Sequence, residues 1–181
     1  MQVNFVSEEA KTLYNNELKY ATEGSSGFDL RAVSFDNSFD RLGSLHNIDK
    51  NWQEDSPPPI TGYTLFSHGR ILVKTGIKVK LPKPRTEDAC IRQCELQIRS
   101  RSGLALKHGI CVLNGIGTID NDYNQEIGVI LYNSSNEPFL IHEGDRVAQG
   151  VIVQVVKPLS FNYDDNIDDN ERGGFGSTGI K

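Results

Sequence analysis

The sequence predicts an all-β domain, and three observations support this prediction. Runs of valine, isoleucine and leucine alternate with polar residues, as in strands with one buried face. Glycine, asparagine, aspartate or proline interrupts these runs about every ten residues, as turns between short strands do. Helical patterns are scarce. Many short strands with frequent turns are typical of a β-sandwich, a β-barrel or a jelly roll.

The composition narrows the class of protein. At 181 residues the chain is expected to form one domain with a sizeable core. Its net charge of −5 provides no general basic field, so we expect no direct binding of nucleic acid. The N-terminal stretch lacks an apolar signal core, and no run of about 18 apolar residues occurs, so we expect no membrane span.

The three cysteines, Cys90, Cys94 and Cys111, do not form a paired framework. Cys90 and Cys94 have the wrong spacing for a CxxC metal site, and no histidine pair accompanies them. We therefore expect reduced thiols, which suit an intracellular compartment. The expected location is the cytoplasm of a bacterium or of a virus-infected cell.

The first third of the chain is predicted to hold a weak helix candidate at 7–18, a strand and a long excursion. The stretch SSGFDLRA, residues 25–32, indicates a turn that enters a strand, with Asp29 capping a backbone group. Residues 36–60 have no clear period and contain the only tryptophan and a triple proline. Loops of this length are uncommon in compact domains and are often functional.

The middle of the chain contains the clearest strand signals. CELQIRS, residues 94–100, places Cys94, Leu96 and Ile98 on one face. RILVKTGIKVKL, residues 70–81, puts every second residue on an apolar face: Ile71, Val73, Thr75, Ile77, Val79 and Leu81.

A short helix is predicted at 102–109, with Ser102 as the N-cap and Gly109 as the C-terminal stop. Arg99 and Arg101 precede the positive end of this helix and would repel it unless an anion or an acidic partner were present. Two interpretations stay open: an ordinary capped helix, or a cradle for an anion built from N–H groups, a hydroxyl and a guanidinium.

Residues 115–130, GIGTIDNDYNQEIGVI, are predicted to form a β-hairpin with a polar tip. In a regular strand Asp120 and Asp122 would share one face and Tyr123 would lie on the other. Paired carboxylates coordinate Mg²⁺ or activate water. A solvated tip is the alternative.

Two further apolar runs, IGVILYN at 127–133 and RVAQGVIVQVV at 146–156, are predicted to be buried strands. Arg146 and Gln149 are polar positions in the second run and need partners if they are buried. A structural pair between Arg146 and a carboxylate and a role in a site are both open.

The C-terminal segment is acidic and polar over 161–171, as in a linker, and ends in NERGGFGSTGIK. A frayed tail is one interpretation. The other is a flexible flap in which Arg172 grips an anion, Phe175 stacks on a flat ring, and Ser177 and Thr178 donate hydrogen bonds.

In order along the chain, five segments resemble the five motifs of the trimeric dUTPase family: GFDLRA, RSGLALKHGI, GTIDNDYNQE, RVAQ and RGGFGSTG. Each motif alone is weak, but five in order over residues 26–179 are specific. The resemblance implies a jelly-roll-like β-barrel over 1–160 with one short helix, assembled as a homotrimer, and a flexible arm over 161–181. Only the 36–60 excursion has no counterpart.

The resemblance also implies a reaction, in which dUTP is hydrolysed with Mg²⁺ to dUMP and pyrophosphate. This would limit uracil in DNA and supply dUMP for thymidylate synthesis. Asp120 matches the aspartate that deprotonates a water for attack on the α-phosphorus. Tyr123 matches the residue under the deoxyribose that leaves no space for a 2′-hydroxyl. The uracil edge would pair with the backbone around Asn114, Gly117, Thr118, Ile119, Asp120 and Gly128.

Other matches imply phosphate and metal contacts shared among three subunits. Asp29 matches an acid that holds Mg²⁺ through water, and Arg146 matches a structural partner of the catalytic carboxylate region. The phosphate-contacting positions are Arg101, Ser102, Gly103 and Gln149. The arm of a neighbouring subunit would close the site with Arg172, Phe175, Gly176, Ser177 and Thr178.

The sequence departs from the family pattern at three places, and two alternative functions stay open. Ser100 replaces a proline, and YNQE replaces Tyr-x-Gly-Glu, so Asn124 is expected to take the positive-φ role. Residues 36–60 would cover a trimer edge, contact a partner protein, or extend freely. The alternatives are a dCTP deaminase-like enzyme, or a nucleotide-sensing regulatory binding protein with the same fold.

Overall fold

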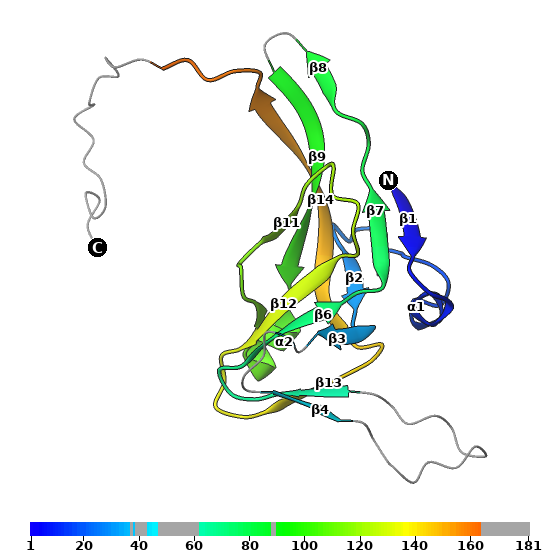
Figure 1. The fold of residues 1–181 in the computed structure, drawn as a ribbon, viewed down its shortest axis with the longest axis vertical. Coiled ribbons are helices and arrows are strands. Elements are labelled where there is room, and N and C mark those ends of the chain that lie inside the picture. The colour runs from blue at the N-terminus through cyan, green and yellow to red at the C-terminus, as the bar shows by residue number, and fades with distance from the viewer. Residues whose placement is uncertain (37, 39–42, 47–61, 88–89, 164–181) are drawn as a thin grey trace.

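The computed structural model describes residues 1–36, 38, 43–46, 62–87 and 90–163 (Figure 1). In this part of the chain fourteen strands and two short helices confirm the all-β prediction. Every strand pair is antiparallel. Neither helix has the length and apolar character needed to cross a membrane.

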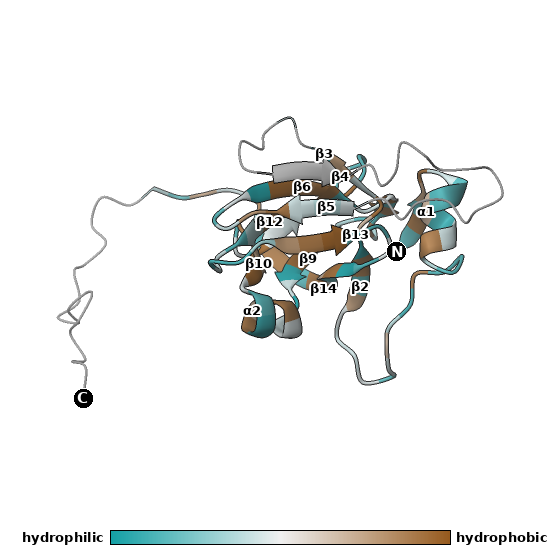
Figure 2. Ribbon diagram, turned by 90° about the horizontal axis from the view of Figure 1, so that it is seen from below, coloured by the Kyte–Doolittle hydropathy of each residue, from teal (hydrophilic) through white to brown (hydrophobic). Residues whose placement is uncertain are grey.

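The largest sheet has five strands, in the order β11-β9-β14-β2, with β8 also paired to β9. Their bounds are β2 Phe28–Arg31, β8 Arg85–Glu87, β9 Cys90–Ser100, β11 Gly117–Ile119 and β14 Arg146–Pro158. The second sheet, β10-β12-β6-β3, lies above the first in Figure 2. Its strands are β3 Ser34–Asp36, β6 Arg70–Lys74, β10 Ile110–Val112 and β12 Gly128–Asn133.

Two smaller sheets complete the described fold. One is β13-β5-β4 and the other is β1-β7. Their strands are β1 Gln2–Phe5, β4 Gly43–His46, β5 Gly62–Leu65, β7 Ile77–Lys80 and β13 Phe139–His142. In the described ranges, every sheet ends in edge strands and no closed barrel forms.

The predicted excursion at 36–60 contains one element that the sequence pattern did not indicate. Strand β4 pairs with β5, with Gly43 opposite Leu65 and His46 opposite Gly62. The rest of the excursion, apart from residues 36 and 38, lies outside the described residues.

The alternation at 70–81 is confirmed by burial, because all six positions of the apolar face are at most 5 % exposed. The run nevertheless forms two strands in different sheets, β6 and β7, with Thr75 and Gly76 between them. Gly76 has a φ of +69°, and a Cβ there would lie 2.6 Å from the Cβ of Ala10. The direction of the chain therefore changes at a position that only glycine occupies without strain.

The two helices differ in detail from the predictions. Helix α1, Glu8–Leu13, begins after Ser7, whose Oγ accepts the amide N–H of Ala10 at 3.1 Å. It is shorter than the 7–18 candidate because Asn15 and Asn16 adopt positive φ. Helix α2, Ser102–His108, has Arg101 rather than Ser102 as its N-cap, so that prediction was wrong.

At the other end of α2 the prediction is confirmed. The C-cap is Gly109, which adopts the left-handed conformation with φ of 69°.

The predicted hairpin at 115–130 is wrong. Strand β11 pairs with β9 in the five-stranded sheet, whereas β12 pairs with β6 and β10 in the other sheet. Residues 120–127 therefore connect two sheets. The side-chain Nδ2 of Asn121 donates to the carbonyls of Pro82 and Cys94, and the backbone N–H of Ile127 donates to Ile77 O. Contacts between segments distant in sequence therefore override the local hairpin signal.

Asn133 is a fully buried polar residue in the core. Its Nδ2 donates to the carbonyls of Leu65 and Glu137, and its Oδ1 accepts from the amide and hydroxyl of Ser135. We expect Asn133→Ala to lower the free energy of unfolding by about 3 kcal/mol, because it leaves buried partners unpaired. Urea unfolding followed by circular dichroism, at one protein concentration, measures the loss.

The exposed Asn136 provides the control for this prediction. Asn136→Ala is expected to change the free energy of unfolding by less than about 0.5 kcal/mol. Equal effects of the two substitutions would contradict the assigned role of Asn133.

Candidate functional site

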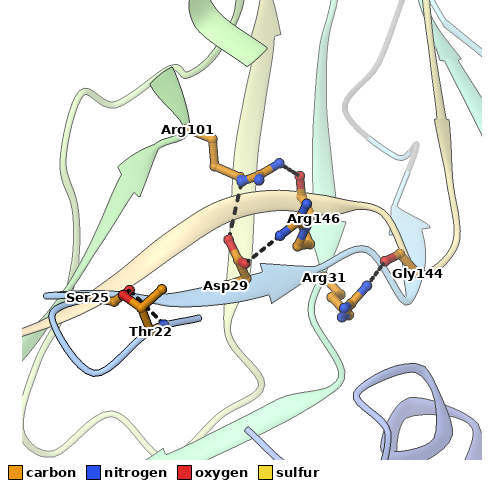
Figure 3. A network of polar contacts seen from close by, with 7 residues as sticks. All are labelled: Thr22, Ser25, Asp29, Arg31, Arg101, Gly144 and Arg146. Carbon is orange, nitrogen blue, oxygen red and sulfur yellow. Dashed lines mark hydrogen bonds and ion pairs between the residues drawn. The ribbon is translucent and has the colours of Figure 1, made fainter. Parts of the chain in front are cut away.

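A carboxylate on β2 lies between two guanidinium groups (Figure 3). Asp29 Oδ1 is 3.3 Å from Arg101 Nε, and Asp29 Oδ2 is 3.3 Å from Arg146 Nη1. The Arg101 Nη1 also donates to Arg146 O at 2.9 Å. These contacts bring together the ends of three elements: β2, α2 and β14. Asp29 lies within the strand, so the prediction that it caps a turn was wrong.

This cluster explains how the positive charge of Arg101 is compensated at the start of α2. Arg101 makes no capping hydrogen bond, because its guanidinium reaches Asp29 and Arg146 instead. Arg99 donates to Gln97 Oε1 at 2.6 and 3.2 Å. The acidic partner that the sequence required for Arg101 is therefore Asp29, and the predicted pair between Arg146 and a carboxylate also exists.

One oxygen of this carboxylate is incompletely satisfied. Asp29 Oδ1 is buried and accepts no hydrogen bond from the described residues, although it faces the Arg101 guanidinium. Buried polar atoms normally have a hydrogen-bond partner, so this oxygen has capacity for a further donor such as water.

Gln149 belongs to the same surface. Its Cα partners are Asp29 on β2 and Arg99 on β9, so the three residues form one row across the outer face of the five-stranded sheet. Gln149 is exposed. Ser102 and Gly103, the first two residues of α2, are also exposed, and a Cβ on Gly103 would meet open space.

Two cavities flank the Asp29 cluster. One of about 270 Å³ is lined by Asp29, Arg146, Arg31 and Tyr14, among others. Burial raises the pKa of Tyr14 to about 12, so its hydroxyl stays protonated at physiological pH; it accepts the Arg31 amide N–H. The second cavity, about 260 Å³, is lined by Arg101 and Arg146 together with apolar residues of α2 and β13.

The positioning of Arg31 was not predicted from the sequence. Its Nη1 donates to Gly144 O at 2.6 Å and so holds the turn that precedes β14 (Figure 3). The Thr22 and Ser25 hydroxyls, 2.8 Å apart, close the loop that leads into β2.

The loop after β11 carries the second group of predicted site residues. Asp120 is exposed directly after the strand, and its carbonyl accepts the amide N–H of Tyr123 at 3.1 Å. Tyr123 is 38 % exposed, and its hydroxyl donates to Glu126 O at 3.1 Å. Asp120 and Asp122 lie in a turn rather than a strand, so the alternation expected for them does not apply.

Asn124 does not take the positive-φ role that the departure from the family pattern predicted. Its side-chain Nδ2 instead donates to Asp122 O at 2.8 Å, which closes the tip of the loop without a left-handed residue.

The remaining predicted residues of this region lie at the ends of β11 and β12. A Cβ on Gly117 would be 3.4 Å from Asn114 Nδ2, so these two residues are neighbours. Thr118 is exposed and Ile119 is half-buried. A Cβ on Gly128 would be 2.7 Å from Leu72 Cδ1, so β12 packs closely against the Leu72 side chain of β6 at this position.

The two groups of residues lie at opposite edges of one sheet. Asp29 is on the edge strand β2, and the 120–123 loop follows the other edge strand, β11, with β14 and β9 between them. Three strand spacings of about 4.8 Å separate these edges by roughly 14 Å. Arg172, Phe175, Gly176, Ser177 and Thr178 lie outside the described residues.

Comparisons with known proteins identify a family and relatives that this chain resembles. Residues 56–179 match the family model described as dUTPase. The chain is 41% identical over 164 residues to the deoxyuridine 5'-triphosphate nucleotidohydrolase of Helicobacter pylori strain P12, covering 90% of this chain and 88% of that one.

Solved structures show the same fold. Staphylococcus bacteriophage 80alpha dUTPase with dUPNHPP superposes with a TM-score of 0.64 at 19% identity, covering 99% of this chain and 98% of that one. A mutant dUTPase of phage phi11 of S. aureus, described for its coordination of a structural Mg(II) ion, has a TM-score of 0.61 at 18% identity. That alignment covers 91% of this chain and 97% of the phage protein.

Proposed function

The chain belongs to the dUTPase family, and from this premise we propose that it hydrolyses dUTP to dUMP and pyrophosphate. In the cell this reaction would limit uracil in DNA and supply dUMP. The observation that carries the proposal is the Asp29–Arg101–Arg146 cluster beside Gln149. The cluster combines guanidinium and amide donors, which bind phosphate, with one carboxylate. These residues stand at positions that match the family's phosphate-binding motifs.

The phosphate end of the substrate would lie against the start of α2. Arg101 is 24% exposed, so its guanidinium has access to a ligand while Asp29 holds it in position. Ser102 and Gly103 would donate from the first turn of the helix, and Gln149 would donate from β14. Arg146 would serve chiefly to hold Asp29.

Asp29 also fits an indirect contact with Mg²⁺. In the described ranges no group of three histidine, cysteine, aspartate or glutamate residues is placed to hold a metal. Mg²⁺ at phosphate sites keeps several waters and uses one or two carboxylates together with substrate phosphates, and the buried Asp29 Oδ1 has capacity for such a water. When bound, the ion would neutralise charge on the phosphates.

Asp120 would orient and deprotonate the water that attacks the α-phosphorus in line with the departing pyrophosphate. Its exposed position at the end of β11 supports this role. The Tyr123 ring would pack under the deoxyribose. The uracil edge would pair with the backbone between Asn114 and Asp120, at the glycine-lined end of β11, and with Gly128.

The separation of the two groups supports a site shared between subunits of a homotrimer. A compact substrate would have to bridge about 14 Å within one chain, whereas a neighbouring copy brings the second edge to the first. Apolar side chains in the last part of β14 and just after it are also available for an interface: Val156 is 55 % exposed, Leu159 53 % and Phe161 76 %. The arm from 161 would extend from there to a neighbour's site, where Arg172, Phe175, Gly176, Ser177 and Thr178 would close it.

Pyrophosphate release from dUTP, dCTP, dTTP and UTP, each with Mg²⁺, tests the proposal. We expect kcat/KM for dUTP to exceed that for each other nucleotide by about 10²-fold or more. Cytosine would leave polar groups of the base-pairing site unpaired, thymine adds a 5-methyl group to a close-fitting pocket, and UTP adds a 2′-hydroxyl against the Tyr123 ring. Ammonia release from dCTP would instead support a deaminase, and binding of dUTP without turnover would support a nucleotide sensor.

A further inference from the structure

Glu126 joins the loop that carries Asp120 and Tyr123 to a turn in the core. Its Oε1 accepts the Gly76 amide N–H at 2.8 Å, and its Oε2 is 3.6 Å from Lys74 Nζ. The side chain is only 22% exposed. A carboxylate that accepts a backbone N–H in such a position makes one of the stronger hydrogen bonds in proteins.

The turn that holds Glu126 is itself rigidly placed. A Cβ on Gly76 would lie 2.6 Å from Ala10 Cβ and 2.8 Å from Val33 Cγ2, so the turn packs tightly against α1 and the segment after β2. The amide N–H and hydroxyl of Thr75 both donate to Ile127 O, at 3.1 and 2.7 Å. The chain at Glu126 and Ile127 is therefore attached to the core at several points.

Tyr123 is held at both ends by this loop. Its amide N–H donates to Asp120 O, and its hydroxyl donates to the backbone carbonyl of Glu126. The residues between them, 124 and 125, are exposed and are not constrained by a left-handed glycine. The position of the ring consequently depends on the orientation of the Glu126 peptide.

We infer that Glu126 is a positioning residue whose carboxylate, bound to the Gly76 amide, holds the Tyr123 ring as a fixed wall against a 2′-hydroxyl. This inference rests on the proposed function. It assigns the rejection of ribonucleotides partly to a residue that contacts no substrate. An apolar surface excludes an added hydroxyl only weakly if it can move away from it. Strong exclusion of the 2′-hydroxyl therefore requires that the Tyr123 ring stay in place.

The test compares kcat and KM for dUTP and UTP in Glu126→Asp, Glu126→Ala and Glu126→Gln. Aspartate keeps the charge but is one methylene too short to reach Gly76, and alanine removes the acceptor. We expect both to lower the ratio of kcat/KM for dUTP over UTP by about tenfold, the value of one hydrogen bond to a charged group. Glutamine keeps an oxygen that accepts the Gly76 N–H and should restore most of the ratio.

Two controls separate positioning from general stability. Lys74→Gln removes only the ion pair and should leave the ratio within about twofold, because partly exposed pairs contribute little. Glu137→Ala removes an exposed acid elsewhere and should leave the ratio unchanged. A purely structural role of Glu126 would lower turnover of both nucleotides equally, with no change in the ratio.

A second measurement needs no substrate. Fluorotyrosine placed at position 123 alone should give a narrower ¹⁹F line in Glu126→Asp than in the unsubstituted protein, because the ring becomes more mobile. If Glu126→Ala does not fold, the kcat/KM ratios and line widths of Glu126→Asp and Glu126→Gln test the inference. An unchanged ratio and line width in folded Glu126→Asp, or equal loss in Glu126→Gln, would overturn the inference.

Failure of the proposed function has a different signature. In that case the unsubstituted protein would release no pyrophosphate from dUTP, and the ¹⁹F line width alone would then decide whether Glu126 holds Tyr123.

Discussion

Asp120→Asn is expected to abolish pyrophosphate release from dUTP while dUTP still binds. The substitution keeps the size of the side chain and its place after β11 but removes the basic oxygen that would take a proton from water. General-base assistance is worth on the order of 10²–10⁴-fold, so kcat should fall by at least about 10²-fold. Binding of a non-hydrolysable dUTP analogue, measured by calorimetry, should change by less than about tenfold because phosphate and base contacts remain.

Asp122→Asn is the matched control for this prediction. Asp122 is an exposed acid two residues further along the same loop, and its carbonyl rather than its carboxylate has a partner in the loop, the Asn124 amide. We expect its kcat to stay within about threefold of the unsubstituted value. Turnover by Asp120→Asn near the starting rate would reject Asp120 as the base.

The second large effect is the recovery of activity when two inactive variants are combined. Asp120→Asn removes the proposed general base at the β11 edge, and Arg101→Gln removes the proposed phosphate-binding guanidinium beside β2. If each site takes these groups from different subunits, a mixed trimer contains some sites in which both are intact. A mixed trimer of either 2:1 composition has both intact groups in one of its three sites, so about a third of full activity should return in isolated mixed trimers.

Co-expression with two different affinity tags and sequential purification isolates the mixed trimers, and light scattering checks their mass. Each variant purified alone provides the baseline. Isolated mixed trimers with no more activity than either variant would mean that one chain supplies both groups, which contradicts the shared site.

The local patterns of the sequence predicted much of the fold. Alternation over 70–81 predicted six buried positions, and all six are buried. Gly109 predicted the end of α2, since a left-handed residue closes a helix irrespective of the surrounding fold. The order of five short motifs predicted the family, because it depends only on residue identity and spacing.

The predictions that failed involve contacts between distant segments. The 115–130 hairpin had suitable turn residues, yet the bonds from Asn121 and Ile127 to other strands place its two arms in different sheets. Ser102 is a good N-cap by type, but Arg101 takes that position because its guanidinium reaches Asp29, 72 positions earlier in the chain. The contact between Glu126 and Gly76 was not predicted, since the two residues are 50 positions apart.

The sequence by itself determined the all-β class and the family, because short-range periodicity and motif order need no knowledge of the folded state. Only the tertiary structure decided that Asp29 lies between Arg101 and Arg146, and that the Asp120 loop lies at the opposite edge of the sheet. Strand order is set by burial of apolar faces and by hydrogen bonds between segments more than a hundred residues apart, such as Arg146 and Asp29, and no local pattern records those pairings.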